Sequence, residues 1–130
     1  MKNKGVLPDT CAWIEYFKPG ASALKQTLER LLLNDNIFLC GPVLYELTQG
    51  LKFDNEKSAV MEALNSLEYI ETSKQLWIKA GEMSLALRQE GKTIPFSDIL
   101  IAAIAVEKNL SILTVDKHFD EIKGVKVSPV

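Results

Sequence analysis

Short apolar runs recur along the chain and alternate with longer segments whose apolar residues repeat at helical spacing. We predict strands at residues 6–7, 37–40, 69–70, 110–115 and 125–127. We predict helices at residues 11–17, 22–33, 42–50, about 55–67, 74–90 and 98–108, with a short helix after Asp116. This alternation predicts an α/β fold, a three-layer sandwich in which a central, mainly parallel five-stranded sheet is flanked by helices.

The segment 98–108 is apolar on nearly every side, which is typical of a helix buried in the middle of a protein. Ser97 is the predicted N-cap of this helix, and Asp98 then lies in its first turn. An acid in that place is held at the end of a rigid, buried element, which is a good position for a catalytic ligand. Residues 34–36 (Asn-Asp-Asn) predict a turn between the second helix and the second strand.

Four acids stand at junctions between the predicted elements. Asp9 follows the first strand, Asp116 follows the fourth, Asp98 opens the buried helix, and Glu46 lies on the flank of a helical apolar stripe. The carboxyl ends of parallel strands share one edge of a sheet, so these side chains can meet there. A cluster of carboxylates is a good site for a hard divalent cation.

Each acid also has an ordinary structural interpretation. Asp9 and Asp98 are residues that favour helix N-termini, where backbone N–H groups lack partners. Asp116 is typical of a turn carboxylate that accepts from its own backbone, and Glu46 is typical of a solvated helix acid. The position of Asp9 directly after a buried strand favours a functional role for it.

Length and composition narrow the class of protein. The chain of 130 residues suits one domain, 1–130, and its hydrophobic content of 47% is that of a globular protein. The apolar run 99–106 is too short to span a bilayer, and Pro8 and Asp9 interrupt any signal-peptide core. We therefore expect a cytoplasmic protein with no membrane partner. The net charge of −2 argues against binding nucleic acid by bulk charge alone, although a bound metal inverts the sign of an acidic pocket.

The remaining reactive residue types add little. Cys11 and Cys40 are predicted to be two small buried hydrophobic residues, and a zinc site is not indicated because His118 is the only histidine. His118 is predicted to lie at the surface or rim, with contact to a substrate phosphate as a secondary hypothesis. The candidate basic contacts to a substrate are Lys52, Lys92 and Lys117.

Four segments together resemble the motifs of PIN domains. Residues 6–14 (VLPDTCAWI) resemble the opening DTSxWI motif, and residues 42–47 (PVLYEL) resemble the central glutamate helix. Residues 94–103 (IPFSDILIAA) resemble the P-x-x-D-xx-IAA segment, and residues 113–119 (LTVDKHF) resemble the closing LTxDxxF motif. The resemblance covers nearly the whole chain, and the four motifs stand in the right order with the right spacing.

Within PIN domains the chain is most similar to the small VapC-like toxins of bacterial and archaeal toxin–antitoxin pairs. The resemblance implies a metal-dependent endoribonuclease that uses one or two Mg²⁺ ions, with Mn²⁺ as a substitute. It implies that RNA (tRNA, rRNA or mRNA) is the substrate, that an antitoxin is the partner, and that the chain forms a homodimer. The implied catalytic and metal-binding residues are Asp9, Glu46, Asp98 and Asp116. Apart from the resemblance, we predict Thr10 and Thr114 as supporting residues, and Lys117 and His118 as candidate substrate contacts.

Two departures from the family pattern leave these acids untouched. Cys11 stands where Ser is common. Pro8 removes a backbone N–H donor at the end of the first strand, so the hydrogen bonds that hold this strand end are expected to differ from those of the family. Three other classes remain open: a non-catalytic partner- or RNA-binding module, a phosphoryl-transfer enzyme or receiver, and a housekeeping nuclease. The receiver is disfavoured because residues 9–11 (Asp-Thr-Cys) lack a DxD arrangement.

Overall fold

The computed structural model describes residues 5–34, 36–50 and 54–130 of the chain. Its elements are β1 (Val6–Pro8), α1 (Thr10–Phe17), α2 (Ala23–Leu32), β2 (Phe38–Cys40), α3 (Gly41–Gln49), α4 (Asp54–Asn65), β3 (Glu68–Ile70), α5 (Lys74–Gln89), α6 (Phe96–Lys108), β4 (Ser111–Leu113), η1 (Lys117–Glu121) and β5 (Lys126–Val127). The predicted order of helices and strands is therefore confirmed. The predicted turn at residues 34–36 includes Asp35, which lies outside the described residues.

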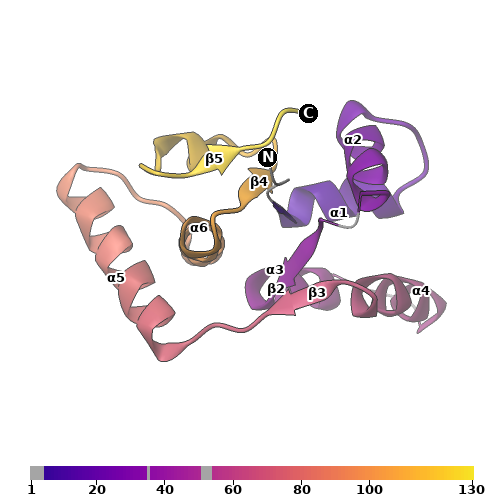
Figure 1. Cartoon of the computed structure of the whole chain (residues 1–130), viewed down its shortest axis with the longest axis horizontal. Coiled ribbons are helices and arrows are strands. Elements are labelled where there is room, and N and C mark those ends of the chain that lie inside the picture. The colour runs from indigo at the N-terminus through magenta and orange to yellow at the C-terminus, as the bar shows by residue number, and fades with distance from the viewer. Residues whose placement is uncertain (1–4, 35, 51–53) are drawn as a thin grey trace.

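The strands form a parallel sheet covered by helices on both faces. β1 pairs with β4 and β4 with β5, while β2 pairs with β3, and a bridge between Val6 and Ile37 joins the two parts. Helices α1 and α2 cover one face, and α6 covers the other with α5 packed on its outer side (Figure 1). The predicted three-layer α/β architecture is confirmed, and β5 lies at an edge as its short, half-polar sequence suggests.

Pro8 explains why the pairing between β1 and β2 is short. The N–H of Val6 donates to the carbonyl of Asn36 at 2.8 Å, on the β2 side of the strand. Successive residues of a parallel strand bond to opposite neighbours, so the next donor on that side would come from Pro8, which has no N–H. On the other side the ladder continues past the strand end, where Asp9 N–H donates to the Leu113 carbonyl at 2.9 Å.

Helix α6 begins earlier than the sequence suggests. Its first residue is Phe96, Pro95 occupies the N-cap position without a side-chain hydrogen bond, and the Pro95 carbonyl accepts from Ile99 N–H at 3.1 Å. The predicted capping role of Ser97 is therefore wrong, because the extended backbone fixed by the proline already starts the helix. Asp98 remains in the first turn, as predicted, and residues 98–105 are all buried. The helix ends at Asn109 in the left-handed conformation (φ 57°).

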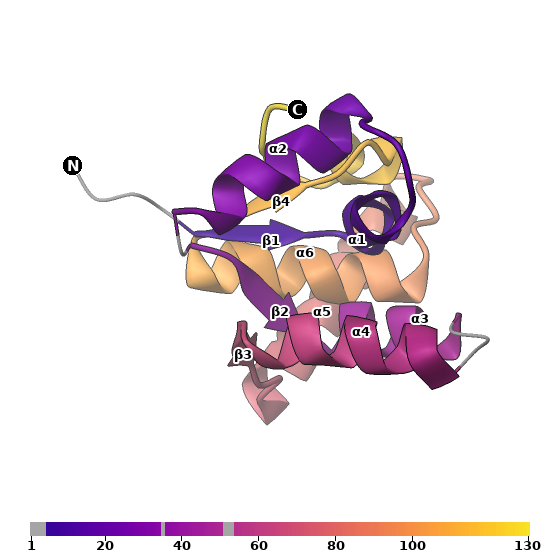
Figure 2. The same cartoon turned by 90° about the vertical axis from the view of Figure 1, so that its right-hand side faces the viewer.

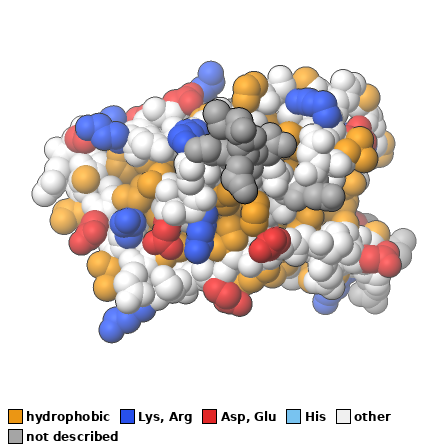
Figure 3. All heavy atoms as spheres, viewed as in Figure 1, with side chains coloured by type: hydrophobic (Ala, Val, Ile, Leu, Met, Phe, Trp, Pro, Cys, Tyr) orange, Lys and Arg blue, Asp and Glu red, His pale blue; other side chains and the backbone are white. Residues whose placement is uncertain are grey.

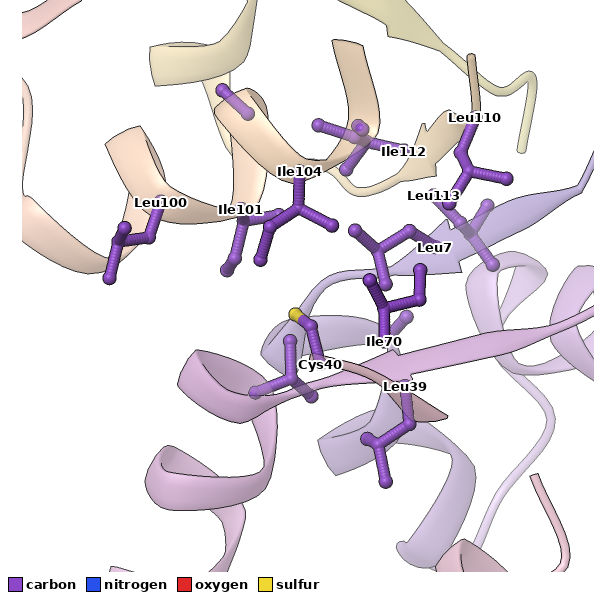
Figure 4. Packing of buried hydrophobic residues seen from close by; sticks show 14 of the residues in the cluster. Leu7, Leu39, Cys40, Ile70, Leu100, Ile101, Ile104, Leu110, Ile112 and Leu113 are labelled. Carbon is purple, nitrogen blue, oxygen red and sulfur yellow. The ribbon is translucent and has the colours of Figure 1, made fainter. Parts of the chain in front are cut away.

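The hydrophobic core lies where α6 packs against the strands. Figure 4 shows Ile101 and Ile104 of α6 facing Leu7 of β1 and Ile112 of β4, and Figure 2 shows α6 running alongside these strands. Cys40 is fully buried in this core, as predicted. None of the helices within the described residues is long and apolar enough to cross a membrane.

Gly5 makes the core sensitive to a single methyl group. A Cβ on Gly5 would overlap the ring of Phe38 and lie 2.7 Å from Leu110 Cδ2, so Gly5→Ala is expected to lower the free energy of unfolding by about 1–3 kcal/mol. The matched control is Gly81→Ala in α5, where a Cβ meets nothing within 4 Å. Because Ala favours the helix over Gly, this substitution is expected to raise the free energy of unfolding by about 0.5–1 kcal/mol. Urea unfolding measures both changes, and equal effects at the two glycines would contradict the prediction.

Candidate metal centre

Three aspartates from distant parts of the chain come together at the carboxyl edge of the sheet. Asp9 follows β1 and is the N-cap of α1, Asp98 lies in the first turn of α6, and Asp116 follows β4 and caps η1. Asp9 and Asp98 are buried, and Asp116 is partly buried. The charge of Asp116 acts to raise the pKa of both buried carboxyl groups, as expected for three acids that share one site.

Thr114 connects Asp9 to Asp116. Its hydroxyl donates to Asp9 Oδ2 at 3.0 Å and accepts from the backbone N–H of Asp116 at 2.9 Å. The other oxygen of Asp9, Oδ1, accepts from Thr10 N–H at 2.7 Å. Both oxygens of Asp9 are thereby oriented, and the supporting role of Thr114 in a catalytic site stays a prediction. The capping interpretations of Asp9 and Asp116 also hold, because each carboxylate accepts from a nearby backbone N–H.

Glu46 is tied to the neighbours of the aspartates rather than to the aspartates themselves. It lies on α3, where its Oε1 accepts from the Thr10 hydroxyl at 2.5 Å and its Oε2 accepts from the Ser97 hydroxyl at 3.0 Å. Thr10 adjoins Asp9 and Ser97 adjoins Asp98 in the chain. The two hydroxyl groups therefore fix the carboxylate of Glu46 beside the aspartates, and the simple solvated-acid interpretation does not describe it.

His118 joins the aspartates in a way that the sequence did not indicate. Its Nδ1 lies 2.9 Å from Asp98 Oδ2 and 3.0 Å from Asp116 Oδ1. The backbone N–H of His118 also donates to Asp116 Oδ1 at 2.9 Å. The available signal was the spacing of Asp116 and His118, since a tight turn after a strand brings the side chains of residues two apart over the same strand end.

Burial dominates the electrostatics of the site. The pKa of Asp98 is raised to about 6, chiefly because the carboxylate is removed from water, with smaller raising contributions from Asp116 and Asp9. Burial likewise raises the pKa of Asp9. Like-charge repulsion acts in the same direction on the pKa of both carboxyl groups, but it is the smaller cause. The pKa of His118 is raised, mainly by its hydrogen bond to Asp98.

The donor set suits a divalent cation. One ligand atom each from Asp98, Asp116 and His118 lie within 4.8 Å of one another. Carboxylate oxygens are the ligands that hard divalent ions prefer, and a bound cation would offset the cost of keeping the buried carboxylates ionised. The residues present therefore fit a metal ion.

The other candidate residues lie as follows. Cys11 is only half-buried, and its Sγ lies 3.6 Å from Asp9 Oδ2 and 3.5 Å from Thr114 Oγ1, so the prediction of a buried hydrophobic residue is wrong for it. Lys117 is exposed beside His118, and Lys92 forms an ion pair with Glu90 at 3.2 Å. Lys52 lies outside the described residues.

Comparisons with known proteins identify the family of the chain. The sequence matches the PIN domain family over residues 6–125. Ribonuclease VapC11 of Mycobacterium tuberculosis is 31% identical over 124 residues, which make up 92% of this chain and 92% of the relative.

Solved structures of related proteins show the same fold. DNA-bound VapBC from Salmonella typhimurium gives a TM-score of 0.84 at 23% identity, over 97% of this chain and 98% of that one. A toxin–antitoxin complex from Klebsiella pneumoniae gives a TM-score of 0.74 at 29% identity, also over 97% of this chain and 98% of that one.

Proposed function

Since this chain belongs to the PIN domain family, we propose that it is a metal-dependent endoribonuclease, the toxin of a toxin–antitoxin pair, that hydrolyses RNA phosphodiester bonds. The observation that carries the proposal is the convergence of Asp9, Asp98 and Asp116 at one edge of the sheet, in a chain 31% identical to a ribonuclease. A purely structural role would not require two buried acids, Asp9 and Asp98, beside the partly buried Asp116.

Each residue has a part in the proposed reaction. Asp9, Asp98 and Asp116 would hold the divalent ion, Mg²⁺ or Mn²⁺, and Glu46 would complete the acidic site from α3. When bound, the ion supplies an activated water and stabilises the negative charge that develops on the scissile phosphate. Thr114 keeps Asp9 in place, while Thr10 and Ser97 keep Glu46 in place, so the ligands are oriented before the substrate arrives.

The substrate is proposed to be single-stranded or looped RNA, whose backbone and bases are accessible. Figure 3 shows acidic and basic side chains interspersed on the face in view, which agrees with the net charge of −2. The net charge therefore gives no reason to expect that bulk charge holds the RNA. Its phosphates are instead drawn to the metal centre, with exposed Lys117 as a candidate contact.

The partners follow from the same proposal. The Klebsiella pneumoniae structure is a toxin–antitoxin complex, and we propose that this chain likewise binds an antitoxin that covers the acidic site, with an Arg paired to its carboxylates. The homodimer expected from the family resemblance and the cytoplasmic location stay predictions, the former measurable by light scattering of the purified chain.

The experiment that tests the function is incubation of the purified chain with total tRNA and rRNA in Mg²⁺, Mn²⁺ or EDTA. Discrete fragments in the metal arms alone are expected. If a folded chain that binds metal leaves every RNA intact, the proposal of a ribonuclease fails, and the non-catalytic binding module takes its place.

Ser97 gives this proposal a test away from the aspartates. Ser97→Ala removes one of the two donors that orient Glu46, and it is expected to weaken binding of Mn²⁺ by about tenfold, the usual effect of removing a group that orients a ligand. Ser97→Thr keeps the hydroxyl and should restore binding, whereas Ser84→Ala on α5 should change nothing. Isothermal titration calorimetry measures all three, and wild-type affinity in Ser97→Ala would refute the positioning role.

A further inference from the structure

His118 is 42% exposed, as predicted for a residue at the rim, but its imidazole has a defined place against the aspartates. The backbone on either side of it is anchored, because its N–H donates to Asp116 Oδ1 at 2.9 Å and the next residue, Phe119, is fully buried in the core. Its imidazole is directed at Asp98 Oδ2 and Asp116 Oδ1, at 2.9 and 3.0 Å from Nδ1. A side chain whose sole task was to meet a substrate phosphate would not need to point at two carboxylates.

The three donors surround a small volume. The ligand atoms of Asp98, Asp116 and His118 lie within 4.8 Å of one another, and they come from α6, from the end of β4 and from η1. Ions with ligand distances of about 2.0–2.2 Å have ligand atoms separated by up to roughly 4.4 Å across the ion. Small side-chain adjustments would therefore bring all three donors onto one ion.

We propose that His118 is a nitrogen ligand of the bound divalent ion, and that this ligand makes the site select a first-row transition ion such as Mn²⁺ over Mg²⁺. The proposal rests on the metal-dependent function proposed above and adds to it the identity of the ion. Magnesium takes oxygen ligands almost alone, whereas imidazole is a ligand for transition ions, whose affinity for nitrogen-containing sites rises along the series from Mn²⁺.

An imidazole that occupies the place of the ion, rather than ligating it, would have the opposite effect on metal affinity. If the imidazole merely fills the place of the ion when no metal is present, the ion must displace it, and removing the imidazole would strengthen metal binding. If the imidazole is a ligand, removing it weakens binding of a transition ion and leaves Mg²⁺ binding nearly unchanged. Whether the affinity for a transition ion falls or rises when the imidazole is removed therefore distinguishes the two alternatives.

The test uses the whole chain without RNA. Mn²⁺ is bound to wild-type protein, to His118→Gln and to a control, Lys108→Gln, which changes the exposed far end of α6. Electron spin-echo spectroscopy of the bound Mn²⁺ detects coupling to a ligating ¹⁴N nucleus. Calorimetry gives the affinities for Mn²⁺ and Mg²⁺, and circular dichroism of each metal-free variant checks that it is folded.

We expect ¹⁴N coupling in wild-type protein and in Lys108→Gln, and none in His118→Gln. The Mn²⁺ affinity of His118→Gln should fall by at least about tenfold, and its Mg²⁺ affinity much less. Absence of ¹⁴N coupling in wild-type protein, or tighter Mn²⁺ binding by His118→Gln, would overturn the proposal. Because no RNA is involved, RNA cleavage without nitrogen ligation would remove this inference and leave the ribonuclease intact.

Discussion

Asp98→Asn is expected to reduce RNA cleavage by at least about a hundredfold while the fold stays intact. An amide carries no charge and is a poor ligand for a hard divalent ion, so the site loses one of its central carboxylates. The amide still fits the first turn of α6, where Asp98 is buried. Fragment yields on tRNA and rRNA measure the loss under saturating Mn²⁺.

The matched control for this substitution is Asp120→Asn. Asp120 is an exposed acid of η1, so its substitution makes the same chemical change without altering the three converging aspartates. The Asp120→Asn variant should cleave RNA as the wild-type chain does. Wild-type cleavage by Asp98→Asn would mean that the acidic cluster is not the active site.

The second large effect is a dependence of the stability of the metal-free chain on pH. Burial raises the pKa of Asp98 from 3.8 to about 6, so the folded state favours the protonated acid. The resulting stability is fully present below pH 3.8 and is lost as the pH rises through about 6. His118 acts in the same direction, because its raised pKa gives stability that is lost as the pH rises beyond the usual 6.5. The metal-free chain should therefore be less stable at pH 8 than at pH 5.

A metal ion should reverse this loss. An ion present at a hundred times its Kd stabilises the folded state by about 2.7 kcal/mol, and the ion binds ionised carboxylates best at the higher pH. Thermal unfolding at pH 5 and pH 8, with EDTA or Mn²⁺, measures both effects. Asp98→Asn isolates the contribution of Asp98: the metal-free variant should be more stable than wild type at pH 8 by about 1–2 kcal/mol, and the gain should vanish at low pH. A stability of the metal-free chain that does not change between pH 5 and pH 8 would contradict this account.

The fold and the aspartates were predictable because their signals are local. Apolar periodicity separates strands from helices, and the rule that ligands bind at the carboxyl ends of parallel strands brings Asp9, Asp98 and Asp116 together. The burial of Asp98 also follows from sequence, since a helix that is apolar on every side must lie in the interior.

The rest of the site depends on relations between distant residues. The hydroxyl of Ser97 is a good cap by composition, but Pro95 already starts the helix, and the hydroxyl instead meets Glu46 from another helix. The imidazole of His118 approaches Asp98 only because β4 and the start of α6 lie together in the folded chain. The periodicity of the sequence does not indicate such contacts between distant residues.

The hydrogen bond from Thr114 to Asp9 joins residues 105 positions apart, and β1 reaches its partner β4 over a similar separation. A chain that emerges from the ribosome folds its local elements first, and long-range parallel pairing has to wait for both strands. A nascent chain that has not yet exposed Ser111–Leu113 therefore has Asp9 but lacks both β4, which pairs with β1, and Asp116. On the proposed function, this enzyme cannot cut RNA until the residues up to Asp116 have been made, which gives a co-expressed inhibitor time to be present when the active site first forms.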